Sequence, residues 1–201
     1  MKSLMEQHLN ADPFAQFIQW FDEAKSHAAI LQPDAMSVAT IDEKGYPDVR
    51  LLLLKGIDHR GFVFYTNMNS VKGKSIQKTP KASLAFFWEV LERQIRVMGD
   101  IVNVSEEEAD AYFLSRPRLS QLGAWASQQS EILSDRKILD DRVAELEKKY
   151  EGKEIPRPPH WKGNRVVPFR IEFWQGRLNR LHDRFIYEKK GDQWHIHRLY
   201  P

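Results

Sequence analysis

The chain has 201 residues, 42% of them hydrophobic, and 30 basic against 28 acidic side chains give a formal net charge of +2. This length and apolar content indicate one globular domain over residues 1–201, and the near balance of charge gives no electrostatic case for a nucleic acid or anionic membrane partner. The absence of cysteine excludes disulfides, cysteine-ligated metals and a cysteine nucleophile. The first residues lack the apolar segment of a secretory signal, and no apolar run reaches the ~20 residues that span a bilayer, so we expect a cytoplasmic protein.

The first predicted element is a helix over about residues 13–28. Asp12 is a suitable N-cap, and Pro13 suits the first helical position. Apolar side chains recur along this segment at helical spacing and predict one buried face, made of Phe14, Phe17, Ile18 and Phe21.

From residue 36 the apolar period changes to two, which is typical of strands. Turn signals at Lys44-Gly45, Arg60-Gly61 and Lys190-Gly191 separate several of these segments. Helices do not alternate regularly with them, so we expect a mainly β fold, an antiparallel barrel with peripheral helices, rather than a doubly wound parallel sheet. The predicted strands are residues 36–41, 49–55, 62–66, 82–88, 93–104, 166–175, 184–188 and 194–199.

Three further helices are predicted, the first a short basic one over residues 72–78. Ser105 and Glu108 match a capping box that starts the second, which should break near Pro117. The third covers residues 134–150, is charged and exposed, and is followed by a proline-rich loop over residues 151–159. Its inward side chains should be Ile138, Val143 and Leu146.

Several catalytic motifs are absent from this sequence. It contains no G-x-G, no H-E-x-x-H and no G-x-S-x-G, so dinucleotide, zinc-protease and serine-hydrolase chemistry lack support. His195 and His197 would share one face of a strand, but two ligands make an incomplete site and no metal is expected. If the protein is an enzyme, an organic cofactor would carry the hard chemistry.

Cationic and hydroxyl side chains collect at two places in the first half of the chain. Arg50 and Lys55 bracket an apolar strand, although two charges at the rim of a sheet would look the same. Tyr65 and Thr66 precede a helix start at which Lys72 and free backbone N–H groups would favour a phosphate. An ordinary capped helix with a solvated lysine is the alternative.

Two more such places lie in the second half. Tyr112, Arg116 and Ser120 are spaced by four and would share one helical face if the helix continued past Pro117. The uncharged polar segment at residues 121–130 then resembles a binding loop.

Near the C-terminus, Arg180, His182 and Arg184 alternate along a segment expected to be extended, so they would face one site. An exposed cationic strand edge is the alternative. Together the four clusters predict one or two ligands that carry phosphate.

A series of longer strings extends from about residue 12 to residue 201: DPFAQFIQWFDEA, RLLLLKG, FYTN, LERQIRV, YFLSRPRLSQLGAWASQQS, RPPHW, RVVPFRIEFWQGRLNRLHDR and the terminal RLYP. With these strings the sequence resembles the pyridoxamine/pyridoxine 5'-phosphate oxidases, whose fold is the FMN-binding split β-barrel. The resemblance implies oxidation of pyridoxamine or pyridoxine 5'-phosphate by O2 to pyridoxal 5'-phosphate with release of H2O2. It also implies a homodimer whose sites draw on both subunits, with a dimerisation and active-site segment at about residues 155–201.

The resemblance assigns site residues one by one. Arg180 and His182 would lie against the substrate's pyridine ring and are the catalytic candidates. The substrate phosphate would be held by Lys55, Tyr112, Arg116 and Ser120. The implied FMN-binding residues are Arg50, Leu53, Leu54, Lys55, Tyr65, Thr66, Lys72, Gln94, Gln129, Ser130, Trp174 and Arg184.

The chain departs from the family pattern at a few positions. Val71 replaces a basic residue beside Lys72, which would weaken flavin affinity. Lys162 and Asn164 replace a glycine and an aromatic residue in what we expect to be a loop, and Met98 replaces an acidic residue. The chain also begins shortly before the DPF string, so an N-terminal arm that covers the substrate in some relatives is expected to be very short or missing.

Two other functions remain open from the sequence. One is a different flavin oxidoreductase on the same barrel, and the other is a protein that binds pyridoxal 5'-phosphate without catalysis. The Lys55, Tyr112, Arg116 and Ser120 set disfavours the first, and Arg180 with His182 disfavours the second.

Overall fold

The computed structural model describes residues 3–201. All nine strands found there join one antiparallel sheet in the order β2-β1-β5-β6-β7-β4-β3, with β8 paired to β7 and β9 to β8. The strands are β1 (Ala35–Ile41), β2 (Pro47–Leu53), β3 (Gly56–Asp58), β4 (Gly61–Asn67), β5 (Lys81–Trp88), β6 (Arg93–Asn103), β7 (Trp161–Gln175), β8 (Asp183–Lys190) and β9 (Gln193–Leu199).

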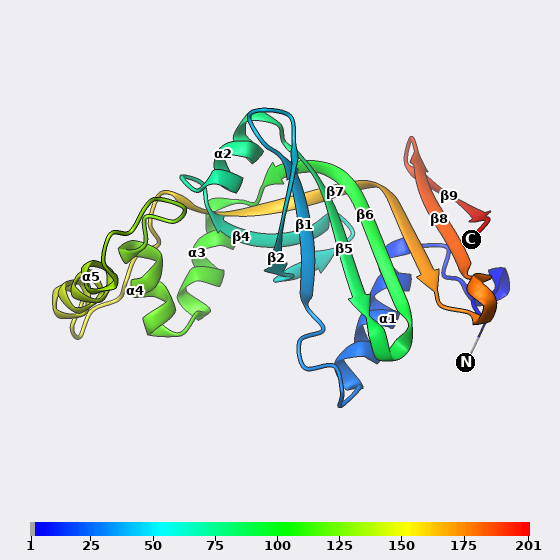
Figure 1. Ribbon diagram of the computed structural model, residues 1–201, viewed down its shortest axis with the longest axis horizontal. Coiled ribbons are helices and arrows are strands. Elements are labelled where there is room, and N and C mark those ends of the chain that lie inside the picture. Colours follow the sequence, from blue (N-terminus) through cyan, green and yellow to red (C-terminus); the bar gives the residue numbers. More distant parts are fainter. Residues whose placement is uncertain (1–2) are drawn as a thin grey trace.

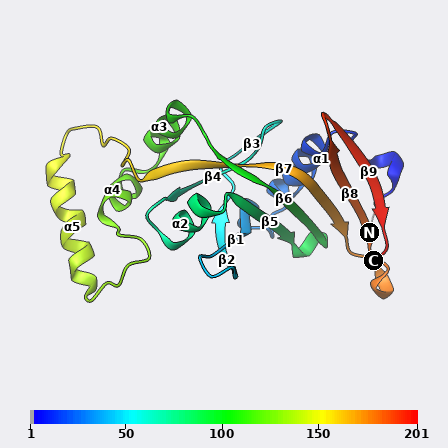
Figure 2. The same ribbon diagram turned by 90° about the horizontal axis from the view of Figure 1, so that it is seen from above.

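Five α-helices surround this sheet: α1 (Pro13–Ser26), α2 (Val71–Lys78), α3 (Glu106–Ser115), α4 (Arg118–Ala126) and α5 (Arg136–Lys149). Three short 3-10 turns, η1 (Glu6–His8), η2 (Glu89–Leu91) and η3 (Leu178–Arg180), complete the described part of the chain. The molecule is elongated, with α4 and α5 at one end and β8, β9 and the C-terminus at the other (Figures 1 and 2). No helix within residues 3–201 is long and apolar enough to cross a membrane, and the cytoplasmic location stays a prediction.

Strand β7 runs through both halves of this architecture. One of its edges pairs with β6 along almost its whole length, while the other pairs with β4 over residues 161–166 and then with β8 over residues 170–175. The strand changes partner around Pro168, which has no N–H to donate to a neighbour. Opposite this proline the register of β6 shifts between Met98 and Gly99, and a Cβ on Gly99 would lie 2.3 Å from the carbonyl oxygen of Val167.

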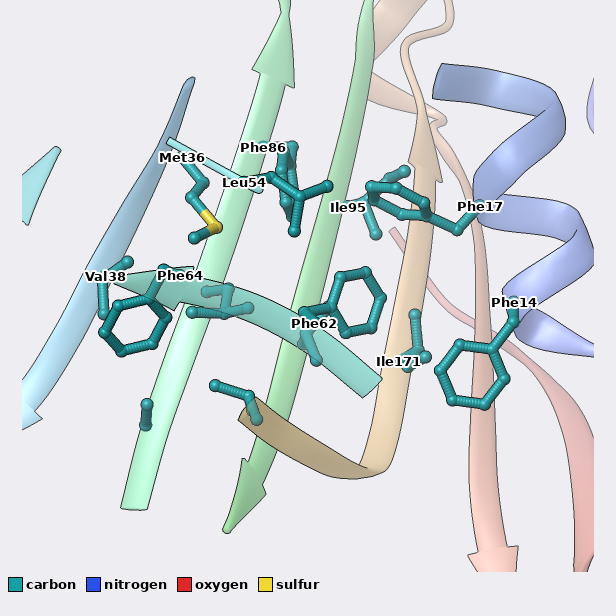
Figure 3. Packing of buried hydrophobic residues seen from close by; sticks show 14 of the residues in the cluster. Phe14, Phe17, Met36, Val38, Leu54, Phe62, Phe64, Phe86, Ile95 and Ile171 are labelled. Carbon is teal, nitrogen blue, oxygen red and sulfur yellow. The ribbon is translucent and has the colours of Figure 1, made fainter. Parts of the chain in front are cut away.

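Helix α1 covers the main core, as its sequence predicts. Asp12 caps it by accepting a hydrogen bond from the Phe14 N–H at 3.0 Å. The ring of Phe17 lies 4.9 Å from that of Phe62 on β4 and 5.0 Å from that of Phe86 on β5, both at steep angles (Figure 3). Burial of such rings is worth roughly 1.5–3 kcal/mol each, so this cluster is a principal source of stability.

Several expectations about these elements were wrong in detail. Ile18 of α1 is 40% exposed, and Trp20 and Ala24 are buried instead. Helix α5 contains no buried residue, and Ile138 is exposed because the helix packs mainly on α4 alone. The predicted binding loop at residues 121–130 is helical as far as Ala126.

Strand boundaries also differ from the prediction. The pattern missed β3, which has only three residues and is too short for a period of two to be seen. Strand β2 ends at Leu53, so Lys55 lies beyond it. Lys162 and Asn164 are part of β7 rather than of a loop. The capping box is half formed: Ser105 accepts from the Glu108 N–H, but the Glu108 carboxylate accepts from Arg60 and Arg165 instead.

Candidate functional site

A pocket of about 390 Å³ lies where β4, α2, α4 and the start of β7 meet. Six of the predicted site residues line it, and they come from separate segments of the chain. Most of the side chains that line it are polar, and two of them, Lys72 and Arg116, are cationic. These polar side chains are Thr66, Asn67, Lys72, Arg116, Ser120, Ser127 and Gln129, and the aromatic ones are Tyr65 and Trp161.

A larger pocket of about 770 Å³ lies beside α1 and contains none of the predicted site residues. Its cation, Arg93, is already neutralised by Glu23 at 2.6 Å, and its guanidinium lies 4.4 Å from the ring centroid of Trp20. The size of a pocket is a weaker guide than its chemistry, so we take the smaller pocket as the candidate site.

Lys72 and the loop after α4 meet at the start of α2. Ser70 caps this helix by accepting from the Gly73 N–H at 3.2 Å. The Lys72 Nζ donates to Gln129 Oε1 at 2.7 Å, and the Val71 N–H donates to Ser130 Oγ at 3.3 Å. Burial, with a contribution from Arg50, lowers the pKa of Lys72. An anion here would be favoured both by the lysine and by the helix N-terminus.

Arg116 is the second cation of the pocket. It follows the last residue of α3 and has an extended backbone, with φ −75° and ψ 150°. Its Nη1 is buried and has no hydrogen-bond partner in the described chain. Burial lowers its pKa, because the charged guanidinium is partly removed from water. A buried cation with a free donor is an arrangement that a phosphate would satisfy.

Tyr112, Arg116 and Ser120 do converge, but not on one helical face as predicted. Pro117 ends α3, and Ser120 belongs to the separate helix α4. The ring of Tyr112 stacks on that of Tyr65 at 4.1 Å, next to the pocket that Arg116 and Ser120 line. The three side chains are therefore gathered by the angle between two helices and not by helical spacing.

Arg50 and Lys55 do not line the pocket. The Arg50 guanidinium donates to the Thr40 hydroxyl at 2.8 Å and pairs with Asp48. Lys55 pairs with Asp34 at 2.9 Å, so the structure does not bring it together with Tyr112, Arg116 and Ser120. Within one chain the structure therefore brings three of these four residues together, and their role in holding a phosphate stays a prediction.

The neighbouring leucines also differ from expectation. Leu54 is buried in the main core, and Leu52 rather than Leu53 lines the pocket. The side chains of a strand alternate between its two faces, so only one of two adjacent leucines can face a given pocket.

The remaining predicted residues form a second group at the far end of β7. Gln94 on β6 lies opposite Trp174 on β7, and the Trp174 ring contacts that of His182 at 4.6 Å. The backbone N–H of Arg177 donates to His182 Nδ1 at 3.1 Å. Arg184 donates from Nε to Glu172 Oε1 at 2.8 Å.

The segment before β8 is not extended as predicted. Asn179 and Arg180 have positive φ angles of 57° and 61°, which is uncommon for residues other than glycine. The alternation expected for Arg180, His182 and Arg184 therefore fails at Arg180, which lies in η3, whereas β8 begins only at Asp183.

The two groups of site residues are separated within one chain. Trp161 begins β7 and lines the pocket, while Trp174 lies near its end. Thirteen residues of strand correspond to about 40 Å along β7 at ~3.3 Å per residue. A single chain therefore holds the predicted site residues in two separate groups.

Trp161, Asn67 and Ser127 line the pocket but were not among the predicted site residues. Each lies in a string that carries the family resemblance: Asn67 ends FYTN, Ser127 lies in the string that ends GAWASQQS, and Trp161 ends RPPHW. These strings were the available signal, but they did not show which of their residues line the pocket.

Comparison with known proteins defines the family. The family model described as pyridoxamine 5'-phosphate oxidase matches residues 23–150, which is more than half of the chain. The chain belongs to this family. The family's C-terminal dimerisation region, described for pyridoxine 5'-phosphate oxidase, matches residues 161–201. A relative from Synechocystis sp. named pyridoxine/pyridoxamine 5'-phosphate oxidase is 53% identical over 98% of this chain and 92% of its own length.

Solved structures confirm the antiparallel split-barrel fold of this oxidase family member. PhzG from Burkholderia lata 383, in complex with tetrahydrophenazine-1-carboxylic acid, superposes with a TM-score of 0.92 at 32% identity, covering 100% of this chain and 99% of the other. A pyridoxamine 5'-phosphate oxidase-related, FMN-binding protein from Nostoc punctiforme gives a TM-score of 0.75 at 16% identity, over 96% of this chain and 100% of the other. The second likeness bears on the fold alone.

Proposed function

We propose that this protein is an FMN-dependent oxidase that converts pyridoxamine 5'-phosphate and pyridoxine 5'-phosphate into pyridoxal 5'-phosphate with O2. H2O2 is released in both reactions, and ammonia is released from the amine. The observation that carries the proposal is the buried, unpartnered Nη1 of Arg116 in a pocket of uncharged polar groups. Together with the 53% identical Synechocystis relative, it favours a phosphorylated substrate.

The pocket suits FMN as the cofactor. Thr66 Oγ1 is buried without a partner, and Lys72 is a partly desolvated cation beside the Gln129 and Ser130 side chains. Unsatisfied buried polar groups cost free energy, which a polar, phosphate-bearing ligand would recover. When bound, FMN would accept a hydride from the substrate's C4′ carbon and pass two electrons to O2. Lys72, Thr66, Gln129 and Ser130 would hold it.

The chain's own residues would bind and orient the substrate. Arg116 would grip the substrate phosphate with two donors, and the hydroxyls of Ser120 and Tyr112 would complete the contact. Lys55 would join them only by leaving Asp34. Holding the reacting carbon in place contributes by proximity, an effect worth up to ~7–11 kcal/mol in well-oriented cases.

A complete site would need two copies of the chain. Residues 161–201 match a dimerisation region, and the two groups of predicted site residues lie at opposite ends of β7. We propose that the pocket of one subunit faces the Trp174, Arg180, His182 and Arg184 end of its partner. Arg180 and His182 would then lie against the pyridine ring and assist proton removal.

The likeness to PhzG supports a second candidate. That protein was solved with a carboxylic acid that has no phosphate, so a split-barrel flavin oxidoreductase for another substrate is the alternative. Its substrate would not require Arg116. A protein that stores pyridoxal 5'-phosphate without turnover is a third reading and would not bleach a bound flavin.

The test is product formation by the purified protein with added FMN in air. Pyridoxine 5'-phosphate should yield pyridoxal 5'-phosphate, followed by absorbance, with matching O2 consumption. Pyridoxine without its phosphate should react far less. In the absence of air, the phosphorylated substrate should bleach the flavin absorbance. Flavin binding without any product would favour the PhzG-like alternative, and product binding without flavin bleaching would favour the storage protein.

A further inference from the structure

The buried arginines of this protein are stabilised in two different ways. Arg165 and Arg157 have side chains less than 10% exposed, and each contacts two carboxylates. Arg116 is also partly buried, but no carboxylate lies within ion-pair distance of it in residues 3–201. The paired carboxylates are Asp58 and Glu108 for Arg165, and Glu106 and Asp110 for Arg157.

Aromatic rings take the place of a carboxylate at Arg116. Its guanidinium carbon lies 4.9 Å from the ring centroid of Trp161 and 5.6 Å from that of Phe113. Both distances are within the range of a cation–π contact, and tryptophan is the strongest partner for one. Of the two rings, only that of Trp161 also lines the pocket.

Trp161 is held rigidly before any ligand arrives. It is 7% exposed, and its ring stacks on that of Tyr65 at 4.9 Å and 9° while the Phe113 ring meets it edge-on at 5.2 Å. Its backbone N–H donates to the Pro158 carbonyl at 2.9 Å, and its carbonyl accepts from Arg157 Nη1 at 2.8 Å. The indole therefore offers a fixed surface to the guanidinium.

A ring and a carboxylate would affect the guanidinium differently. A carboxylate neutralises the charge and uses N–H donors, whereas the face of a ring attracts the cation and leaves its donors free. The unpartnered Nη1 of Arg116 agrees with the second case. The charge and the donors of Arg116 then remain available for an anion in the pocket.

We propose that Trp161 is a positioning residue that holds Arg116 by its indole face and so sets the preference for a phosphorylated substrate. This inference rests on the proposed function, in which Arg116 binds the substrate phosphate. Trp161 acts through Arg116 and takes no part in the oxidation, so its loss should affect substrate binding and not the chemical step.

The experiment compares Trp161→Leu and Trp161→Phe with the unmodified protein at saturating FMN. For Trp161→Leu we expect the KM of pyridoxine 5'-phosphate to rise about tenfold, equivalent to about 1.4 kcal/mol, with kcat changed by less than about twofold. Trp161→Phe retains a ring and should raise KM only about threefold. The dissociation constant of pyridoxal 5'-phosphate, measured by calorimetry, should rise in parallel.

Trp125→Leu is the matched control. Trp125 packs against the same apolar cluster and donates from Nε1 to the Pro156 carbonyl at 2.7 Å, but within residues 3–201 the cation–π contacts of Arg116 are with Phe113 and Trp161. Its loss should lower the unfolding temperature, as the loss of Trp161 should, yet leave KM unchanged. A general loosening of the cluster would instead raise KM in both variants, and that result would overturn the proposal.

A double variant tests the coupling directly. In an Arg116→Ala background, Trp161→Leu should add less than about a twofold rise in KM, because the residue through which it acts is gone. A further tenfold rise, or an unchanged KM in the single variants, would overturn the proposal. If Trp161→Leu does not fold, Trp161→Phe decides by the same criteria.

Failure of the proposed function can be distinguished from failure of this inference. If the proposed function is wrong, the unmodified protein will not form pyridoxal 5'-phosphate. The calorimetric binding of pyridoxal 5'-phosphate needs no turnover, so it still reports whether Trp161 supports anion binding.

Discussion

Arg116 shows how the surroundings of a side chain can leave one of its donors free. Pro117 stops α3 directly after it, so the arginine extends away from the helix and over the rings of Phe113 and Trp161. The neighbouring Arg118 behaves differently and donates to the carbonyls of Tyr150 and Lys153. Of these two arginines, Arg116 lines the pocket and Arg118 binds the backbone after α5.

This difference gives a residue-scale prediction for the proposed oxidase. Arg116→Ala should raise the KM for pyridoxine 5'-phosphate by roughly 10- to 100-fold, since hydrogen bonds to charged groups are worth ~1.5–3 kcal/mol. Steady-state kinetics with Arg118→Ala as the control should show an unchanged KM. If the two substitutions raised KM equally, Arg116 would not be the residue that binds the substrate phosphate.

Asn164 gives a second prediction at this scale. It is fully buried on β7, its Oδ1 has no partner, and its Nδ2 reaches the Lys162 carbonyl only at 3.4 Å. Replacement by leucine removes an unsatisfied polar atom and keeps the number of side-chain heavy atoms, so Asn164→Leu should raise the free energy of unfolding by about 1 kcal/mol. Urea unfolding measures this, with Asn164→Asp as a variant that should destabilise. A less stable leucine variant would show that Oδ1 has a partner after all.

At the scale of elements, α3 is tied to the sheet by charges. Arg165 of β7 and Arg60 of the β3–β4 turn both contact Glu108 on α3 and Asp58 on β3. Burial tends to raise the pKa of Asp58, but hydrogen bonds from the side chain and backbone of Arg60 outweigh it and lower the pKa to about 2. This network fixes the helix that carries Tyr112 and leads to Arg116.

The lowered pKa of Asp58 predicts a pH dependence of stability. A carboxylate with a folded pKa of about 2 and an ordinary value of 3.8 stabilises the fold fully above pH 3.8 and loses that contribution as the pH falls through about 2. Asp58→Asn should lower the free energy of unfolding at pH 7 by less than about 1 kcal/mol, because the side chain is one-third exposed. Urea unfolding at several pH values measures this: the difference in free energy of unfolding between Asp58→Asn and the unmodified protein should become smaller below about pH 4.

Asp100→Asn provides the control for this network. Asp100 pairs with Lys81 at the surface, where both side chains are more than 60% exposed. Its substitution should change stability little at any pH. If the difference in free energy of unfolding between Asp58→Asn and the unmodified protein stayed constant down to pH 3, the charge of Asp58 would not contribute to stability.

Helix α4 illustrates why a polar segment was mistaken for a loop. Gln121 is buried, and its Nε2 donates to the carbonyls of Leu114 and Arg116 at the end of α3. The last carbonyls of a helix need such donors. The polar character that suggested a loop therefore serves the junction between two helices.

For the whole molecule, the separation of the two groups of predicted site residues bears on how the proposed site is assembled. The pocket lies at the start of β7 and the Trp174–His182 contact lies near its end. Figure 2 shows β7 extending between the α4 side and the β8 side of the elongated molecule. If two subunits complete each site, variants damaged in different groups should complement one another.

Arg116→Ala and Arg180→Ala provide this test. Each should be nearly inactive alone at low substrate concentration. After the two are unfolded together and refolded as a mixture, about half of the dimers should contain one of each, and each mixed dimer should have one intact site. The mixture should then recover about a quarter of the unmodified activity. Arg116→Ala mixed with Ser120→Ala, both in the pocket, should recover nothing. No recovery in the first mixture would contradict sites shared between subunits.

The sequence by itself determined the local features of this protein. Neighbouring residues alone indicated the capped apolar helix α1, the strands with alternating side chains, a short helix that starts near residue 72 and the family strings. These features depend on spacing and propensity over a few positions, which is the information that a single sequence holds.

Only the tertiary structure decided how the site is assembled. Four contacts join segments that are separate in the chain. They are the change of partner along β7, the pairing of Lys55 with Asp34, the convergence of Tyr112 and Ser120 across Pro117, and the stacking of Arg116 on Trp161. Such contacts arise from the packing of whole elements, and no periodicity within one element encodes them.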